Sequence, residues 1–537
     1  MRSATFPPVT ARYFRLVLEQ PAAGGVPVAA GIKPLVLTSP VDGNPTVAVS
    51  ALQLFAGPRV NRAEEKAGYA PVPDFYALET QTPDTPAQET DAGKPGAAVG
   101  LQDVLDLTGR MGPDGSLDWA PKAGEWTVLR LGYSLTGHVN APAPADATGL
   151  EVDKLDASLV QEYLETYLGF FEDAVGSGLP GITSLLSDSI ESGPQNWTPR
   201  MREEFQHRRG YDLIPWLPAL TGIIVESAER SDAFLWDYRR TIAELLADNH
   251  YGTLARLARE RGLGYYAEAL EDHRPQLGDD LEMRSHADVP MGAMWCYTPE
   301  EGPRQTYVAD VQGAASVSHV YGKAATGAES MSAFGRPFQF TPQVLKPIVD
   351  MEFALGVNLL NIHTSPHQPD GVPKPGITLS PYLGQSFTRN DTWAHAAGPW
   401  ISYLARCSHL LQQGTYAADV AYFYGEEAPV TGVFGDASPE VPAGYGFDFI
   451  NLDGLLNHVT VTDDGGLLTT GGVRYRLLYL GGTSHRMTLA AVRRVTELLD
   501  AGATVAGWRP EGSPSAGDEA RLWAESVDAL WKPGRPG

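Results

Sequence analysis

The segment GLPGITSLLSDSIES, residues 178–192, shows the unit from which the architecture of this chain is predicted. A short apolar run follows a glycine-containing turn and stops at a carboxylate, Asp188. The residues before the turn form an amphipathic helix pattern, with apolar side chains at intervals of three and four: Val160, Tyr163, Leu164, Tyr167, Leu168 and Phe171. The unit is therefore helix, glycine, short strand and polar residue.

This unit recurs three times along the chain. The recurring strands each end at a polar residue: GYYA before Glu268, AATGA before Glu329 and VNLLNI before His363. Short strands separated by crossover helices pair in parallel. Residues 126–412 are therefore predicted to form a (β/α)8-type barrel, incomplete because four units are recognised, whose strand ends form a catalytic mouth. A doubly wound sheet, which also collects ligands at strand ends, is the alternative.

Two regions of different pattern flank the predicted barrel. Residues 1–125 contain short β-like runs such as Tyr13–Leu18 and Thr46–Leu54, which predict a β-sandwich region. Residues 413–537 contain DVAYFY at 419–424 and further short strands around a helical segment, which predict a small α/β, flavodoxin-like domain. We expect this last domain to be truncated.

The composition excludes several classes of function. Among 537 residues, 40 are Lys or Arg and 65 are Asp or Glu, so the formal charge is −25 and nucleic acid is an unfavourable partner. Cys296 and Cys407 are too few for a disulfide framework or a cysteine-rich zinc site. No apolar stretch predicts a membrane span, and the first residues show no signal peptide. The compartment stays unassigned, since a periplasmic or extracellular protein would need a leader that precedes Met1.

Four carboxylates are candidates for catalysis. Asp188 and Glu191 stand three residues apart in a loop, where mutual repulsion would raise one pKa as a general acid requires. The alternative is that these acidic residues stabilise the N-terminus of the next helix through its dipole, although Glu191 is too distant from that helix to cap it. Glu329 and Glu268 end predicted strands, where either a catalytic or ligand role or a structural ion pair is open.

Other polar residues are weighed in the same way. Asp237 lies inside a strong helix pattern, which favours a structural ion pair or a solvated position. His363 and His367 follow the last strand, and because Pro366 between them breaks a helix, hydrogen bonding to a polar substrate is favoured over zinc.

Aromatic residues near the predicted mouth suit a sugar, although core packing also explains such residues: Trp197, Trp295, Tyr297, Phe334 and Trp393. The chain contains no GxSxG, Walker, HExxH or dinucleotide motif, which leaves carboxylate chemistry as the simplest prediction.

Several long segments resemble glycoside hydrolase family 106, the α-L-rhamnosidases: DSIESGPQNWT, GKAATGAESMSAF, GVNLLNIHTSPHQP and GFDFINLDGLL. The resemblance runs from about residue 100 to about residue 510. It implies a barrel with β-sandwich attachments and inverting hydrolysis of terminal α-L-rhamnose. It also implies a calcium ion beside the sugar and a rhamnose-containing oligosaccharide, polysaccharide or glycoside as substrate.

The resemblance also implies site residues. The acidic positions that match by motif are Asp188, Glu191, Asp237, Glu329 and Asp448. The expected catalytic residues are Asp188, Glu191 as general acid and Glu329 as general base, with the reverse order of the last two left open. Expected substrate contacts are Glu268, Asp237, Asp448, His363 and Trp295. The calcium ligands stay unassigned, with Glu268 and Asp288 as candidates.

The resemblance departs from the family in length, because family members are longer and their first barrel strands precede the β-sandwich zone. We therefore expect this polypeptide alone to be weakly active or inactive. Two other functions stay open: a glycosidase of another sugar specificity on the same barrel, and a catalytically impaired carbohydrate-binding protein.

Overall fold

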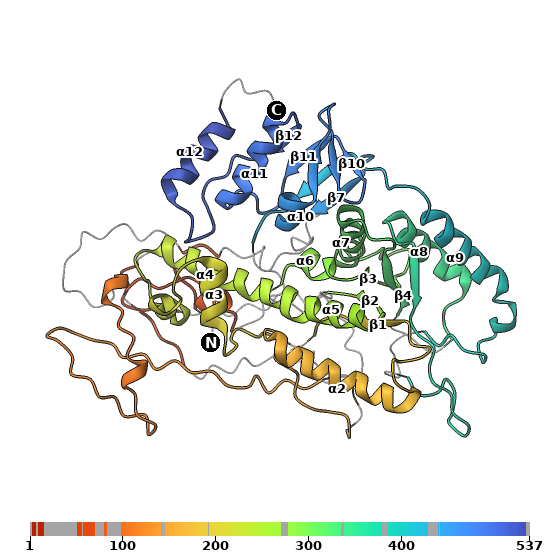
Figure 1. Ribbon diagram of the computed structural model, residues 1–537, viewed down its shortest axis with the longest axis horizontal. Helices are drawn as coiled ribbons and strands as arrows, with labels where there is room; N and C mark the ends of the chain where they lie inside the picture. Colours follow the sequence, from red (N-terminus) through yellow and green to blue (C-terminus); the bar gives the residue numbers. More distant parts are fainter. Residues whose placement is uncertain are drawn as a thin grey trace.

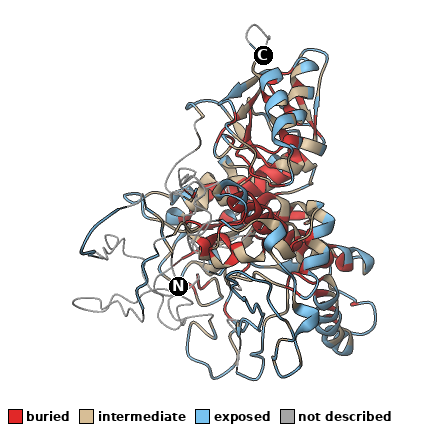
Figure 2. Ribbon diagram, turned by 90° about the vertical axis from the view of Figure 1, so that its left-hand side faces the viewer, coloured by how far each residue is buried: buried red, intermediate tan, exposed pale blue. Residues whose placement is uncertain are grey.

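The computed structural model describes most of the chain, namely residues 3–6, 9–15, 51–55, 57–69, 80–82, 98–140, 143, 145–191, 193–269, 278–333, 338–378, 385–427, 439 and 441–532. A parallel sheet surrounded by helices forms the middle of the molecule, and a second sheet with its own helices lies beside it at the top of the view (Figure 1). Buried residues run without interruption from one sheet toward the other (Figure 2). No helix in the described part of the chain is long and apolar enough to cross a membrane.

The central sheet is parallel and curled, with its strands in sequence order. These strands are β1 (Ser184–Ser187), β2 (Gly264–Ala267), β3 (Val289–Trp295), β4 (Gly327–Ser332) and β5 (Leu359–Ile362). Each strand pairs in parallel with the next one along the chain. A doubly wound sheet would reverse its order at a switch point, so this order is that of a barrel wall. The sheet forms half of a barrel, and closure into eight strands stays a prediction.

The structure contains one strand, β3, that is not among the four units expected from the sequence. Its segment VPMGAMW contains Pro290 and Gly292, which weaken a strand pattern. The glycine is needed because a Cβ on Gly292 would lie 2.9 Å from the backbone of Asp310, on the helix α7 (Gln305–Tyr321). The backbone N–H of Ala293 donates to Asp310 Oδ2 at 2.7 Å, which fixes the helix on the strand.

Helices cover the central sheet: α2 (Ala157–Val175), α3 (Met201–Arg209), α4 (Ala228–Leu245), α5 (Thr253–Glu260), α6 (Asp280–Ser285), α7, α8 (Pro342–Ala354) and α9 (Gly398–Leu411). A 3-10 segment (Ile214–Thr221) precedes α4, a π-helical turn (Leu246–Gly252) joins α4 to α5, and a 3-10 turn (Ala394–Ala396) precedes α9.

The predicted stripe of α2 divides into two faces. Val160, Leu164 and Leu168 are buried against the core, whereas Tyr163, Tyr167 and Phe171 remain on the surface in contact with one another. Both sets are spaced at i, i+4, so the spacing alone does not identify the packed face, and it is the aliphatic set that packs on the core.

The described residues before 126 contain no strand. They form α1 (Ala63–Lys66) and the 3-10 turns Leu101–Asp103 and Thr108–Arg110. A buried ion pair between Lys66 Nζ and Asp232 Oδ1, 2.6 Å apart, fastens α1 to α4. Of the expected runs at 13–18 and 46–54, residues 13–15 and 51–54 are described and form no strand. The rest lie outside the described residues, so the β-sandwich region stays a prediction.

The region after 413 contains a four-stranded parallel sheet in the order β12-β11-β6-β7: β6 (Val420–Phe423), β7 (Phe447–Ile450), β11 (Leu477–Leu480) and β12 (Val505–Gly507). Numbered within this sheet, the order is 2-1-3-4, as in flavodoxin-like sheets. An antiparallel meander accompanies it: β8 (Val459–Val461), β9 (Leu467–Thr469) and β10 (Arg474–Tyr475). Its helices are α10 (Leu452–Asn457), α11 (Leu489–Asp500) and α12 (Ala520–Leu530). Its status as a separate, truncated domain stays a prediction.

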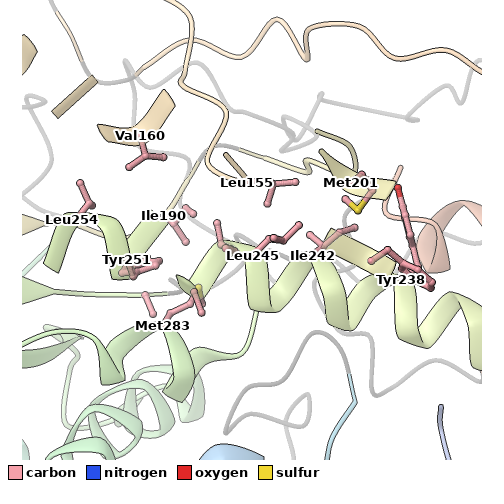
Figure 3. Close-up of a cluster of buried hydrophobic side chains, with 14 of the residues drawn as sticks. Leu155, Val160, Ile190, Met201, Tyr238, Ile242, Leu245, Tyr251, Leu254 and Met283 are labelled. Carbon is pink, nitrogen blue, oxygen red and sulfur yellow. The ribbon is translucent and has the colours of Figure 1, made fainter. Parts of the chain in front are cut away.

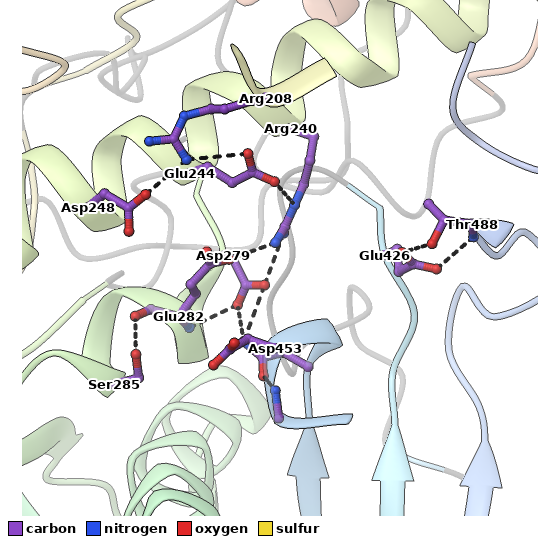
Figure 4. A network of polar contacts seen from close by, with 12 residues as sticks. Arg208, Arg240, Glu244, Asp248, Asp279, Glu282, Ser285, Glu426, Asp453 and Thr488 are labelled. Carbon is purple, nitrogen blue, oxygen red and sulfur yellow. Dashed lines mark hydrogen bonds and ion pairs between the residues drawn. The ribbon is translucent and has the colours of Figure 1, made fainter. Parts of the chain in front are cut away.

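A buried polar network joins the helices of the central sheet to the C-terminal region (Figure 4). Arg240 on α4 contacts Asp279 at 3.1 Å and Glu282 at 2.7 Å. Asp279 also accepts a hydrogen bond from Asn451 Nδ2, at the start of α10. Each charge therefore has an opposite charge or a donor beside it, as burial requires. This network makes the two regions one packed unit.

Candidate active site

Three carboxylates meet at the C-terminal ends of the central strands. Asp188 follows β1, Glu268 follows β2 and Glu329 belongs to β4. One oxygen atom from each of the three lies within 4.8 Å of the others. Because β1 to β4 run in parallel, residues separated by up to 141 positions are brought to one edge. The unit found in the sequence therefore predicts this meeting point.

The loop after β1 is held in place by Ile190, which stands between the two acidic residues of that loop. The Ile190 side chain is buried in the core beside residues of α4 and α5 (Figure 3). Its backbone N–H donates to the carbonyl oxygen of Ala269 at 2.8 Å, just beyond β2. The loop is thereby tied to the end of the neighbouring strand, which places Asp188 next to Glu268.

Glu191 lies on the same loop but is not a member of the three-carboxylate cluster. Its Oε1 accepts a hydrogen bond from the hydroxyl of Ser189 at 2.8 Å. Its carbonyl oxygen lies 3.2 Å from His138 Nε2. The side chain is half-buried, so it remains accessible to a ligand at the strand ends.

The environment of Glu329 changes its acidity. Burial raises its pKa above the usual value, and the negative charge of Asp188 acts in the same direction. The neighbouring His363 and a hydrogen bond donated by Ser332 oppose this effect. Glu268 is 3% exposed, and its backbone N–H donates to the carbonyl oxygen of Ser187 at 3.1 Å. Two of the three carboxylates are thus largely withdrawn from water.

His363 and Trp295 lie on the strands that flank Glu329. His363 Nδ1 is 3.8 Å from Glu329 Oε1. Trp295 ends β3 opposite Ser332 of β4, and its ring stacks on Tyr307 with centroids 6.3 Å apart. Both positions agree with the expectation of substrate contacts, which stays a prediction. His367 is exposed and lines a separate cavity, so the two histidines do not form a pair.

The remaining aromatic candidates are dispersed. Trp197 stacks on Tyr133, Trp393 lines the cavity of His367, and Tyr297 packs in a hydrophobic cluster with Cys296. Phe334 lies outside the described residues.

Asp237 is not brought to the cluster. It is fully buried on α4, where it accepts hydrogen bonds from Tyr211 Oη at 2.7 Å, Ser515 Oγ at 2.8 Å and the backbone N–H of Ala516 at 2.9 Å. Burial raises its pKa to about 6. Its partners join α4 to the C-terminal region, as expected from the helix pattern for a structural residue.

Asp448 on β7 is also placed away from the cluster. Its Oδ1 lies 2.8 Å from His319 Nδ1 and accepts a hydrogen bond from Ser316 Oγ, both on α7, while Oδ2 accepts one from Tyr475 Oη. With 1% exposure it lies in the contact between α7 and the C-terminal sheet. Neither Asp237 nor Asp448 is in a position that favours the substrate contact implied by the resemblance.

Asp288, a calcium candidate, lies at the opposite end of the sheet. It pairs with Arg259 at 3.0 Å, and its Oδ2 accepts from the backbone N–H of Tyr265 near the start of β2. Of the two calcium candidates, only Glu268 belongs to the three-carboxylate cluster, and calcium binding stays a prediction.

Sequence reasoning missed two features of this edge. Ser332, which donates to Glu329, stands three residues after it and could have been noticed as a hydroxyl at the same strand end. A cavity of about 710 Å³ lies next to His363, between the ends of β4 and β5 and the connection to α9. Its walls combine the ends of β4 and β5 and the start of α9 with the irregular segments between them, and those segments carry no periodic pattern.

Three comparisons relate this chain to glycosidases, two of them to rhamnosidases. A family profile described as alpha-L-rhamnosidase matches residues 19–535. The structure of a rhamnosidase from Novosphingobium sp. PP1Y is similar, with 48% identity and a TM-score of 0.81, over 90% of this chain and 46% of that one. A curated relative from Formosa agariphila, provisionally named a beta-glucuronidase, is 34% identical over 450 residues, which cover 82% of this chain and 36% of the relative. The chain thus spans less than half the length of either protein.

Proposed function

Because the chain belongs to glycoside hydrolase family 106, the alpha-L-rhamnosidases, we propose that it hydrolyses terminal α-L-rhamnosides at the three-carboxylate edge of its central sheet. The observation that carries this proposal is the approach of Asp188, Glu268 and Glu329 to within 4.8 Å at the C-terminal strand ends. Glycoside hydrolysis requires carboxyl groups at one cavity, and barrel enzymes place them at this end.

Inversion requires a general acid and a general base about 6.5–9.5 Å apart, so that a water fits between the base and the sugar. Within the cluster, one oxygen of each carboxylate lies within 4.8 Å of the others, which is nearer than this separation. Glu191, on the same loop but outside the cluster, therefore suits the general acid that protonates the leaving oxygen. Glu329 suits the general base that takes a proton from water, since Ser332 and His363 orient one of its oxygens.

The cluster also has the donor set that calcium prefers. Two oxygens bound to one calcium ion at about 2.3–2.6 Å can lie at most about 5 Å apart. The spacing of Asp188, Glu268 and Glu329 satisfies this limit, so these residues would hold the ion. A bound calcium ion would supply positive charge to orient sugar hydroxyls. The residues of the chain would still move the protons, Glu191 at the leaving oxygen and Glu329 at the water.

The test uses the purified chain with calcium and two rhamnosides, 2,4-dinitrophenyl and methyl α-L-rhamnoside. Glu329→Gln should lower kcat by about 100-fold or more on both substrates. Glu191→Gln should do so on the methyl glycoside alone, because dinitrophenolate leaves without protonation. Glu162→Gln, on the exposed face of α2, is the matched control. Proton NMR should show β-L-rhamnose as the first product, and release of the α-anomer would contradict inversion.

A second specificity is favoured by the name of the Formosa agariphila relative. 4-Nitrophenyl β-D-glucuronide therefore belongs in the same assay, and preference for it over the rhamnosides would replace the proposal. The third function is that of a catalytically impaired carbohydrate-binding protein, and calorimetry with L-rhamnose tests it. Binding of L-rhamnose by both the wild type and Glu329→Gln, without turnover of any substrate, would support this function.

A further inference from the structure

The imidazole of His138 contacts the loop after β1 from a segment that lies outside the central sheet. The carbonyl oxygen of Glu191 can only accept a hydrogen bond, so His138 Nε2, 3.2 Å away, carries the hydrogen and donates it. The ring also lies against Gly193, because a Cβ on this glycine would be 3.4 Å from His138 Cε1. The imidazole therefore contacts the loop at two points.

The segment that carries His138 is fixed to the core of the molecule. The carbonyl oxygen of His138 accepts a hydrogen bond from the backbone N–H of Glu151 at 3.0 Å. Next to this bond, Val139 and Leu150 form an antiparallel bridge. Shortly beyond Glu151 the chain enters the hydrophobic core at Leu155, which is 2% exposed. The backbone of His138 is thus held by main-chain pairing, unlike that of a residue on an unattached surface loop.

A second contact joins the same segment to the same loop. The ring of Tyr133 stacks on that of Trp197, with centroids 6.2 Å apart and planes inclined by 27°. Tyr133 precedes His138, whereas Trp197 follows Glu191, so the segment crosses the loop in the opposite direction. The two contacts together cover the outer side of the loop.

Three hydrogen bonds act on different groups around Glu191. The backbone N–H of Ile190 donates to the carbonyl oxygen of Ala269 at 2.8 Å, which holds the loop on its inner side. The hydroxyl of Ser189 donates to Glu191 Oε1 at 2.8 Å. The bond from His138 acts on the carbonyl group of Glu191 itself. This restraint matters because a reacting group displaced by about 1 Å can lose about 100-fold in rate.

We propose that His138 is a positioning residue, which holds the backbone of Glu191 so that its carboxyl group meets the leaving oxygen. The consequence for turnover rests on the proposed general-acid role of Glu191, whereas the effect on the loop does not. His138 acts through Glu191 and transfers no proton to the substrate. Protonation by Glu191 matters for a poor leaving group and not for dinitrophenolate, so loss of His138 should affect the two kinds of substrate differently.

The experiment compares three variants. His138→Ala removes the donor, His138→Gln keeps an N–H donor at a similar reach, and Leu135→Ala changes a 79% exposed residue of the same segment as the matched control. With methyl α-L-rhamnoside, His138→Ala should lower kcat by about tenfold or more. With 2,4-dinitrophenyl α-L-rhamnoside the change should stay below about twofold. His138→Gln should recover most of the loss, and Leu135→Ala should match the wild type.

Hydrogen–deuterium exchange measures the placement of the loop without turnover. The amide of Ile190 is protected by its bond to the carbonyl oxygen of Ala269. If His138 holds the loop, this amide should exchange about fivefold faster or more in His138→Ala, because the bond opens more often. In Leu135→Ala it should exchange at the wild-type rate.

The outcomes separate this proposal from the proposed function. An equal fall in kcat on the two substrates in His138→Ala, or no fall on either, overturns the positioning role, and so does unchanged exchange of the Ile190 amide. If no rhamnoside is hydrolysed, or if Glu191→Gln shows no selective loss on the methyl glycoside, the acid assignment fails. The exchange result then decides whether His138 holds the loop.

Discussion

The imidazole of His363 lies beside the carboxylate of Glu329, with Nδ1 3.8 Å from Oε1 across the paired strands β4 and β5. The two residues end consecutive units of the sequence pattern, and the parallel register brings them together. The histidine lowers the pKa of Glu329, whereas burial and Asp188 raise it. The ionised form that a general base requires therefore depends on this neighbour.

The first prediction concerns the acidic limb of the pH profile. His363→Gln removes the group that lowers the pKa of Glu329, so the carboxyl becomes protonated at a higher pH. The acidic limb of kcat/KM should move to higher pH, and the loss of activity relative to the wild type should grow as the pH falls. His409→Gln, exposed on α9, is the control and should keep the wild-type profile. An unchanged acidic limb in His363→Gln would show that His363 does not set the pKa of Glu329 in the active enzyme.

The second prediction concerns the cation. Glu268→Gln removes one carboxylate from the cluster and should weaken calcium binding by about tenfold or more in calorimetry. Asp288→Asn, at the opposite end of the sheet, should bind calcium as the wild type does. Chelation should lower turnover reversibly in the wild type. Equal calcium affinities for Glu268→Gln and Asp288→Asn would place the ion elsewhere.

The third prediction concerns the loop of Asp188 and Glu191. Ile190 is buried, and Ile190→Ala should lower the free energy of unfolding by about 2–4 kcal/mol, against about 0.5–1.5 kcal/mol for Ile190→Val. The loss leaves a cavity beneath the loop, so the alanine variant should also have lower kcat than the valine variant. Urea unfolding and turnover measure the two effects. A stability loss with full activity would show that the anchor does not position the acids.

The sequence predicted that carboxylates at the strand ends meet at one edge of the sheet, but it missed one of the five strands of that sheet. The strands that end just before Asp188 and Glu268 could be recognised because each follows a helix and a glycine. The strand expected to end before Glu329 was placed too early, because β4 begins at Gly327 and continues through Glu329 to Ser332. Strand β3 could not be recognised, because Pro290 and Gly292 obscure it and the close approach of α7 that requires the glycine is a tertiary fact.

Two acidic positions from the family resemblance show what a motif match leaves undecided. Asp237 and Asp448 match by motif, yet both accept hydrogen bonds in contacts with the C-terminal region rather than at the cluster. A motif preserves a residue without saying whether it binds the ligand or holds two regions together. The apolar cavity was missed for another reason, since it forms where the ends of β4 and β5, the start of α9 and the connections between them pack together, and no local pattern encodes that packing.

The last prediction concerns Asp237 and the pH dependence of stability. Its pKa is about 6 in the folded chain against 3.8 in the reference state, so the folded chain binds more protons between these values. Stability must then fall as the pH rises from about 4 to about 6, by up to about 3 kcal/mol from this group. Asp237→Asn removes the dependence, so the free energy of unfolding of the wild type should decline relative to this variant over that range. Urea unfolding at several pH values from 4 to 7 measures the difference, with Glu229→Gln on the exposed face of α4 as control. Parallel pH curves for the wild type and Asp237→Asn would mean that the hydrogen bonds from Tyr211, Ser515 and Ala516 compensate fully for the burial of the charge.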